Sequence, residues 1–148
     1  MKDWPLLILA AVASFVIPFQ AIINGRLGQS LDHRLYAAFF SFVGGTTTLI
    51  ILVLCTTPGI PRWPAQTSIP WYYFTGGLLG VVFVTTVLTV TPKIGAGNVV
   101  AATVVGQLIM AMIIDHFGIM GVEPFRIGWS RLAGAALLIA GVILIHNK

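Results

Sequence analysis

Five long apolar stretches follow one another along the chain, and short polar segments separate them. A helix needs about 20 mostly apolar residues to cross roughly 30 Å of hydrocarbon, and each stretch is close to that length. None of them alternates polar and apolar residues at period two, as a membrane β-strand does. The pattern therefore predicts transmembrane helices at residues 4–23, 35–56, 70–91, 97–117 and 129–145.

The segments between these stretches carry residues that end helices and residues that favour membrane surfaces. Pro92 and Gly95 lie between the third and fourth stretches, where proline removes a backbone donor and glycine lets the chain turn. Trp71 and Trp129 fall near expected membrane edges, as an aromatic belt requires. We expect one all-α integral membrane domain over residues 1–148.

The composition supports a lipid environment. Hydrophobic residues make up 57% of the 148 positions and charged residues only 8%, whereas a soluble domain is about 25% charged. So few charges cannot cover a folded surface in water. The formal net charge of +4 comes from basic residues scattered singly, a pattern typical of charges that flank membrane helices. We therefore expect the lipid bilayer as a partner, and no nucleic acid.

The sequence offers no chemistry typical of an enzyme. It contains no cluster of metal-ligating residues, no nucleophile–base pair and no cofactor motif. Its one cysteine, Cys55, lies in an apolar run, where packing is the expected role. We expect no catalytic residues, no cofactor and no metal site.

The basic residues divide evenly between the two membrane sides. Five spans place the two ends of the chain on opposite sides, and an excess of Lys and Arg on one side normally sets orientation. A tie leaves two hypotheses. The chain inserts in both orientations and forms an antiparallel homodimer, or other features, such as a related five-helix subunit in a heterodimer, set one orientation. The N-terminal side receives Lys2, Arg62, Arg126 and Arg131, and the opposite side receives Arg26, Arg34, Lys93 and Lys148.

Small residues recur four apart within the spans. In lipid, such small-xxx-small patterns let helices approach closely, since hydrophobicity no longer drives association. They predict a tight bundle, with most of these contacts inside the chain and some available to a second copy. The glycines expected to pack are Gly44, Gly45, Gly76, Gly80, Gly106, Gly134 and Gly141.

Two pairs of polar residues interrupt the spans. Gln20 and Asn24 are four apart, and so are Thr103 and Gln107, so each pair shares a helix face. Polar groups in hydrocarbon face a cavity or another helix. One interpretation is a substrate-binding cavity lined by all four residues. The other is hydrogen bonding between helices, with Asn24 as a cap at its helix end.

Asp115 is the only acidic residue within a predicted span, and His116 follows it. Arg131 begins the next span on the same side. An ion pair between Asp115 and Arg131 that joins the two helices is one interpretation, and proton coupling through the carboxylate is the other. Because no acidic residue lies deep in a span, exchange of protons through a central carboxylate is not expected.

The chain resembles the YdcZ family of five-helix inner-membrane proteins in the drug/metabolite transporter superfamily. That superfamily includes ten-helix inverted-repeat proteins and four-helix antiparallel dimers. Its four-helix exporters carry a glutamate in their first helix, and this chain has none there. The residues that carry the resemblance are Gln20-x-x-x-Asn24, Ser41-Phe42-x-Gly44-Gly45, Pro70-Trp71, Gly76-Gly77-x-x-Gly80, Pro92-x-x-Gly95, Gly106-Gln107, Asp115-His116-Phe117-Gly118 and Arg131-x-x-Gly134.

These observations predict a secondary transporter of a small metabolite or drug-like solute that works by alternating access in a dimer. The antiparallel pair would form a ten-helix bundle. The alternatives are a structural or regulatory membrane subunit that transports nothing, and a small dimeric channel.

Overall fold

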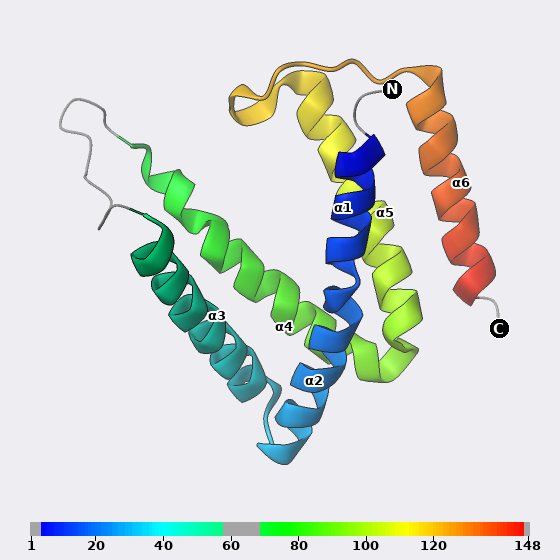
Figure 1. Cartoon of the computed structure of the whole chain (residues 1–148). Helices are drawn as coiled ribbons and strands as arrows, with labels where there is room; N and C mark the ends of the chain where they lie inside the picture. Colours follow the sequence, from blue (N-terminus) through cyan, green and yellow to red (C-terminus); the bar gives the residue numbers. More distant parts are fainter. Residues whose placement is uncertain (1–3, 58–68, 147–148) are drawn as a thin grey trace. The chain divides into compact units, whose positions relative to one another are not determined.

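The computed structural model describes residues 4–57 and 69–146, and all regular secondary structure within these ranges is helical. Five helical stretches there are long and apolar enough to cross a membrane, which confirms the predicted all-helical class (Figure 1). Lys2, Arg62 and Lys148, which the count of flanking charges used, lie outside the described residues. The five stretches are Trp4–Ser30, Arg34–Thr56, Trp71–Ile94, Ala96–Phe117 and Trp129–His146.

The first span consists of two helices, α1 (Trp4–Ser14) and α2 (Val16–Ser30), with Phe15 between them. Pro18 explains the interruption. It has no N–H to donate to the carbonyl of Ser14 one turn earlier, so the regular hydrogen bonding stops there. Phe15 keeps right-handed helical angles and its N–H donates to the Val12 oxygen at 3.1 Å, so the helical path continues.

The predicted end of this span at residue 23 is wrong, because α2 continues to Ser30. Asn24 lies inside the helix and does not cap it. Its side chain is only 6% exposed and donates from Nδ2 to Ser41 Oγ at 3.1 Å. A partner on the next helix therefore lets a polar residue stay within α2, where the sequence pattern favoured a loop.

A tight turn joins α2 to α3 (Arg34–Thr56). Asp32 takes a left-handed conformation, with φ of 57°, and His33 Nδ1 accepts a hydrogen bond from the Leu35 N–H at 3.2 Å. Gly28 permits the close approach, since a Cβ there would lie 3.2 Å from the Arg34 Cα. The two helices thus pack as a hairpin whose closest point is next to the turn (Figure 1).

The third span begins with a short 3₁₀ segment, η1 (Trp71–Thr75), and continues as α4 (Gly76–Ile94). Pro92 lies inside the last turn of α4, so the helix ends at Ile94, slightly beyond the predicted boundary near residue 91. The break comes at Gly95, whose φ of 83° is a left-handed conformation that favours glycine.

The buried core of this part of the chain is small. Ala37 and Ala38 of α3 and Leu88 of α4 are buried together, and Leu27 of α2 and Val84 of α4 pack against them. Three helices therefore meet around two alanines, where small side chains allow close packing in lipid.

The chain divides into two compact units, Met1–Pro92 and Lys93–Lys148. The second unit contains α5 (Ala96–Phe117), the short segment η2 (Ile119–Gly121) and α6 (Trp129–His146). Helix α5 ends at Gly118, which has a φ of 61° and donates its N–H to the Ile114 oxygen. Helices α5 and α6 pack against each other as the core of this unit.

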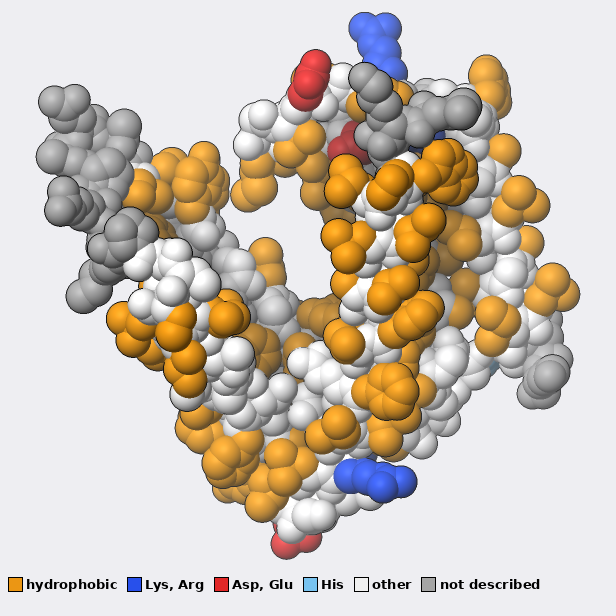
Figure 2. Space-filling model, viewed as in Figure 1, with side chains coloured by type: hydrophobic (Ala, Val, Ile, Leu, Met, Phe, Trp, Pro, Cys, Tyr) orange, Lys and Arg blue, Asp and Glu red, His pale blue; other side chains and the backbone are white. Residues whose placement is uncertain are grey.

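The glycines expected to pack are mostly open within the described residues. Only Gly80 has a neighbour, because a Cβ there would lie 3.5 Å from the Phe42 ring. Close packing of the other glycines against helices, inside the chain or in a second copy, stays a prediction. Figure 2 shows apolar side chains along the helices and charged side chains near helix ends, as lipid contact requires. The glycines with no neighbour within 4 Å are Gly44, Gly45, Gly76, Gly106, Gly134 and Gly141.

Candidate functional site

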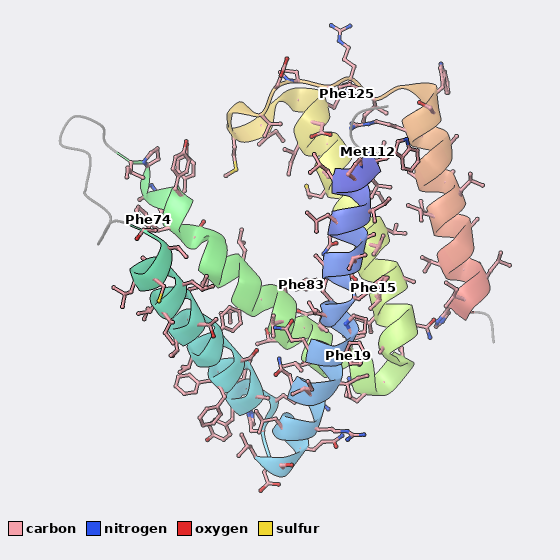
Figure 3. The ribbon with its side chains drawn as sticks, viewed as in Figure 1. Phe15, Phe19, Phe74, Phe83, Met112 and Phe125 are labelled. Atoms are coloured by element: carbon pink, nitrogen blue, oxygen red, sulfur yellow. The ribbon has the colours of Figure 1, made fainter. Side chains whose placement is uncertain are left out.

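A water-sized pocket lies beside the buried amide of α2. Its volume is about 30 Å³, which is enough to hold a water molecule. Gln20 and Asn24 both line it, so the structure brings these two predicted residues to one place. Phe83, labelled on α4 in Figure 3, faces the same pocket. Its full lining is Ile17, Gln20, Ala21, Asn24, Phe83, Val84, Val87 and Leu88.

A larger cavity of about 640 Å³ opens at the turn between α2 and α3. Small-molecule sites typically have about 300–1,000 Å³, so a metabolite fits here. We call this space the outer cavity. One wall comes from the end of α2 and the turn, and the other from one face of α4. The lining residues are Gly25, Gly28, Gln29, Asp32, His33, Arg34, Leu35, Thr85, Leu88, Thr89 and Pro92.

Leu88 lines both the outer cavity and the water-sized pocket. Its side chain is 2% exposed and belongs to the core cluster with Ala37 and Ala38. A single buried leucine therefore stands between the charged turn and the amide pair of Gln20 and Asn24. No sequence motif predicted this role, because one leucine in an apolar span cannot be told from the other apolar residues by pattern.

The other two predicted substrate-binding residues lie in the second unit, on α5. Thr103 Oγ1 donates to the Val100 oxygen at 2.9 Å, so this hydroxyl bonds within its own helix. Gln107 is exposed and has no hydrogen-bond partner among the described residues. Because these residues belong to a different unit from Gln20 and Asn24, the four-residue substrate site stays a prediction.

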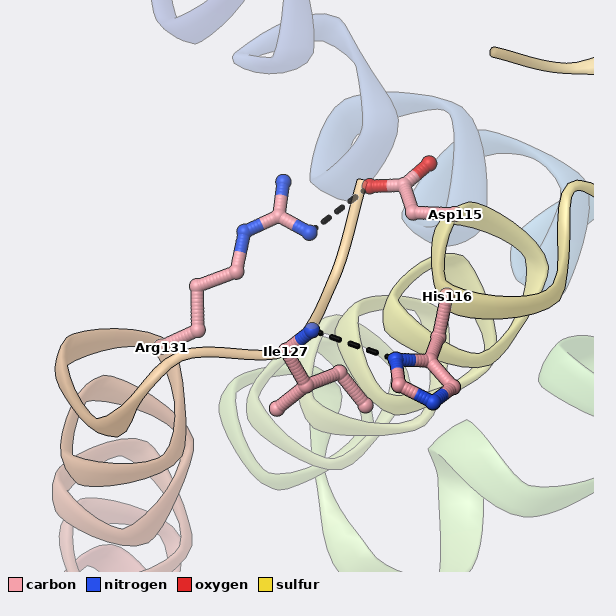
Figure 4. A network of polar contacts seen from close by, with 4 residues as sticks. All are labelled: Asp115, His116, Ile127 and Arg131. Carbon is pink, nitrogen blue, oxygen red and sulfur yellow. Dashed lines mark hydrogen bonds and ion pairs between the residues drawn. The ribbon is translucent and has the colours of Figure 1, made fainter. Parts of the chain in front are cut away.

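The connection between α5 and α6 is held by a polar network (Figure 4). Arg131 Nη1 lies 2.9 Å from Asp115 Oδ2, and His116 Nδ1 accepts the Ile127 N–H at 3.2 Å. The Phe125 N–H donates to the Asp115 backbone oxygen at 2.7 Å, and the Arg131 guanidinium lies 4.4 Å from the Phe125 ring centre. The loop is thus fastened to both helices. Sequence reasoning missed Phe125 and Ile127, since their roles depend on the loop path.

An apolar groove of about 470 Å³ runs between α5 and α6 below this ion pair. Gly134 and Ala135 form part of it, and the lack of a side chain beyond a methyl group at either position leaves the space open. Its lining residues are Leu108, Ala111, Met112, Asp115, Arg131, Gly134, Ala135 and Leu138.

Five apolar spans among the described residues define a multi-pass α-helical membrane protein, and its first unit places a buried amide near two spaces that share Leu88 in their linings. The chain belongs to the family described as "Putative inner membrane exporter, YdcZ", whose model matches residues 5–144. It is therefore a multi-pass protein of the inner membrane. A search of curated proteins found no match to the chain, and a search of solved structures also found none.

Proposed function

We propose that this protein is a secondary transporter that moves a small metabolite or drug-like solute by alternating access in a dimer. Family membership supports a membrane transport role. The observation that carries the proposal is the arrangement in the first unit, where Leu88 separates the outer cavity from a pocket lined by two amide side chains. A carrier needs a space that opens to the outside, a thin barrier, and polar groups within the membrane.

The polar groups of this route favour neutral or zwitterionic solutes. The amides of Gln20 and Asn24 can donate and accept hydrogen bonds without a net charge. Asp115, the acidic residue within a described span, lies at the end of α5. Its carboxylate already pairs with Arg131. This distribution supports recognition by hydrogen bonds in preference to binding of a strongly charged ion.

A dimer would supply the second half of the transport path. Many secondary transporters consist of two inverted repeats with the site between them. Two oppositely oriented copies of this five-span chain would provide that symmetry, and the even division of basic residues supports it. The open glycine faces on both units are suited to close helix contacts with another copy. A related five-helix subunit is the alternative partner.

Labelling of Lys148 in cells tests the orientation. Antiparallel pairing of identical chains predicts that a membrane-impermeant reagent reaches this residue from both sides. Labelling from one side only would rule out dual orientation and favour the heterodimer.

Uptake into proteoliposomes tests the function itself. A thermal-stability screen of the detergent-solubilised protein first selects a solute, since a specific ligand stabilises by mass action. A carrier predicts saturable uptake of that solute, and Asn24→Leu should reduce it about tenfold or more. Thr47→Val is the matched control, because the Thr47 hydroxyl is exposed and bonds to its own helix at the Val43 oxygen. Unsaturable flux would indicate a channel, and no flux a structural subunit; either result contradicts the proposal.

A further inference from the structure

We propose that the outer cavity is a docking site for a small zwitterion, whose acidic group binds Arg34 and whose ammonium group binds Asp32. The inference rests on the proposed transport function, since it names the class of solute that the carrier would take from this side. It comes from the charges of the cavity and from its two unlike walls.

The first observation is the pair of unused charges. Asp32 and Arg34 both line the outer cavity and are only two residues apart. Across the described residues, neither side chain has a hydrogen bond or an ion pair, whereas Asp115 and Arg131 in the other unit do pair. Asp32 sits on left-handed backbone in the turn, and Arg34 begins α3. The same cavity thus offers a carboxylate and a guanidinium at separate places.

The second observation is the wall contributed by α2. Gly25 and Gly28 are three residues apart and face the cavity together. A Cβ at Gly25 would meet nothing within 4 Å, so the missing side chain leaves usable volume. Gln29 adds an amide to this wall, one that can donate to an acidic group or accept from an ammonium. All strongly polar groups of the cavity therefore come from α2, the turn and the start of α3.

The third observation is the opposite wall, which α4 forms. Thr85, Leu88, Thr89 and Pro92 follow the helical spacing of one face. The hydroxyls of Thr85 and Thr89 donate to carbonyls of their own helix, at 2.7 and 2.8 Å. The wall therefore presents methyl, leucine and proline carbons to the cavity. A molecule with both charges at one end and an apolar group at the other matches the two walls together.

The location allows this chemistry. The turn at residues 31–33 connects two spans, so the cavity opens at the membrane surface, where water reaches the charged groups. A zwitterion can replace that water with one contact to each charge, without net charge entering the membrane. Charge-assisted hydrogen bonds to guanidinium and carboxylate are among the strongest polar contacts in proteins.

Two sources can supply this ligand chemistry. A dissolved amino acid carries a carboxylate and an ammonium, and the phosphatidylethanolamine headgroup carries a phosphate and an ammonium. Leucine is a suitable soluble probe, because its apolar side chain fits the α4 wall. Phosphoethanolamine is the matching probe for the headgroup.

Binding of radiolabelled leucine and phosphoethanolamine to the purified full chain in lipid-free detergent tests the proposal. We expect saturable binding of at least one probe. For leucine, competition should need both charges. Two analogues each lack one charge, 4-methylpentanoate and 3-methylbutylamine, and we expect both to compete at least about tenfold more weakly than leucine. Nanodiscs with and without phosphatidylethanolamine separate the two sources, because only a headgroup site loses probe binding when that lipid is present.

Three variants locate the binding. Arg34→Gln and Asp32→Asn should each weaken probe binding about tenfold or more. Gly25→Leu should also abolish it by filling the cavity, while both charges stay in place. Arg26→Gln is the matched control, because Arg26 lies near the same turn but does not line the outer cavity. Absence of binding by both probes, or binding that Arg34→Gln and Asp32→Asn leave unchanged, would overturn the inference.

The experiment separates this inference from the proposed function. Saturable uptake of an uncharged solute that is insensitive to Arg34→Gln and Asp32→Asn would overturn the zwitterion site and leave the transporter standing. Leucine binding with the expected dependence on both charges, but without uptake of any bound probe into proteoliposomes, would leave the site standing and overturn the transporter.

Discussion

Arg131 Nη1 lies 2.9 Å from Asp115 Oδ2 and ties the first turn of α6 to the last turn of α5. The two side chains are 36% and 30% exposed, so solvent screens the pair only in part. Its position at a helix end, together with the contact between Arg131 and Phe125, indicates a structural fastening of the second unit.

We expect Asp115→Asn to lower the stability of the detergent-solubilised protein by about 1 kcal/mol, because a partly exposed ion pair is worth little more. Arg131→Gln should cost a similar amount, and the double variant should cost less than the sum. A double-mutant cycle by thermal unfolding measures this coupling. Strictly additive effects would show that the pair contributes nothing to stability.

His116 is expected to hold the loop between α5 and α6 through the Ile127 N–H. In His116→Phe the ring volume stays similar, but the acceptor is lost, at a cost of about 1 kcal/mol. Hydrogen exchange at the Ile127 amide should then speed up about fivefold, while amides in the middle of α6 keep their rates. Unchanged exchange at Ile127 would contradict the role of His116.

The hydrogen bond between Asn24 and Ser41 should stabilise the α2–α3 hairpin modestly. Ser41→Ala leaves the Asn24 amide without its partner, and we expect a loss of about 1 kcal/mol, as for other interhelical hydrogen bonds in membranes. Thr48→Val is the control, since the Thr48 hydroxyl bonds within α3. Unfolding in detergent measures both variants, and equal losses would argue against a special contribution from Ser41.

Leu88→Ala should open a passage between the outer cavity and the water-sized pocket. We expect a stability loss of about 2 kcal/mol, at the low end for a buried leucine. In a Cys55→Ala background, a cysteine introduced as Asn24→Cys, at a position only 6% exposed, should react faster with a polar thiol reagent when Leu88 is also changed. Leu54→Ala, at a position 66% exposed, is the control and should leave the rate unchanged. Equal labelling rates in both variants would contradict the barrier role of Leu88.

Open glycine faces should matter for assembly more than for folding of the single chain. A Cβ at Gly44 or Gly106 would meet nothing within 4 Å in the described structure, so Gly44→Leu and Gly106→Leu should leave the helix content intact. We expect them to reduce dimer cross-linking in membranes severalfold by holding the two copies apart. Ala10→Leu is the control and adds a similar bulk, one carbon less, on α1. If cross-linking in both glycine variants equals that of the control, these faces are not dimer contacts.

The five spans could be predicted from the sequence because each depends only on a local run of apolar residues. The continuation of α2 to Ser30 could not, since Asn24 and Arg26 look like loop residues until Ser41, distant in sequence, supplies a partner. Pro92 also looked like a stop, but α4 continues past it to Ile94.

The candidate site was only partly predictable for a related reason. The shared face of Gln20 and Asn24 follows from helical spacing, and the structure places both on one pocket. The outer cavity depends on how α4 passes the α2–α3 turn, which no local pattern encodes. The same holds for Phe125 and Ile127, whose backbone N–H groups reach Asp115 and His116 only along the observed loop.

Exchange across the membrane tests the central claim most directly. Proteoliposomes preloaded with the solute that stabilises the protein should take up labelled solute faster than empty ones. In preloaded vesicles, the binding site of a carrier can return to the outer face with unlabelled solute bound. Equal initial rates in preloaded and empty vesicles, under conditions where the solute binds, would contradict transport by alternating access.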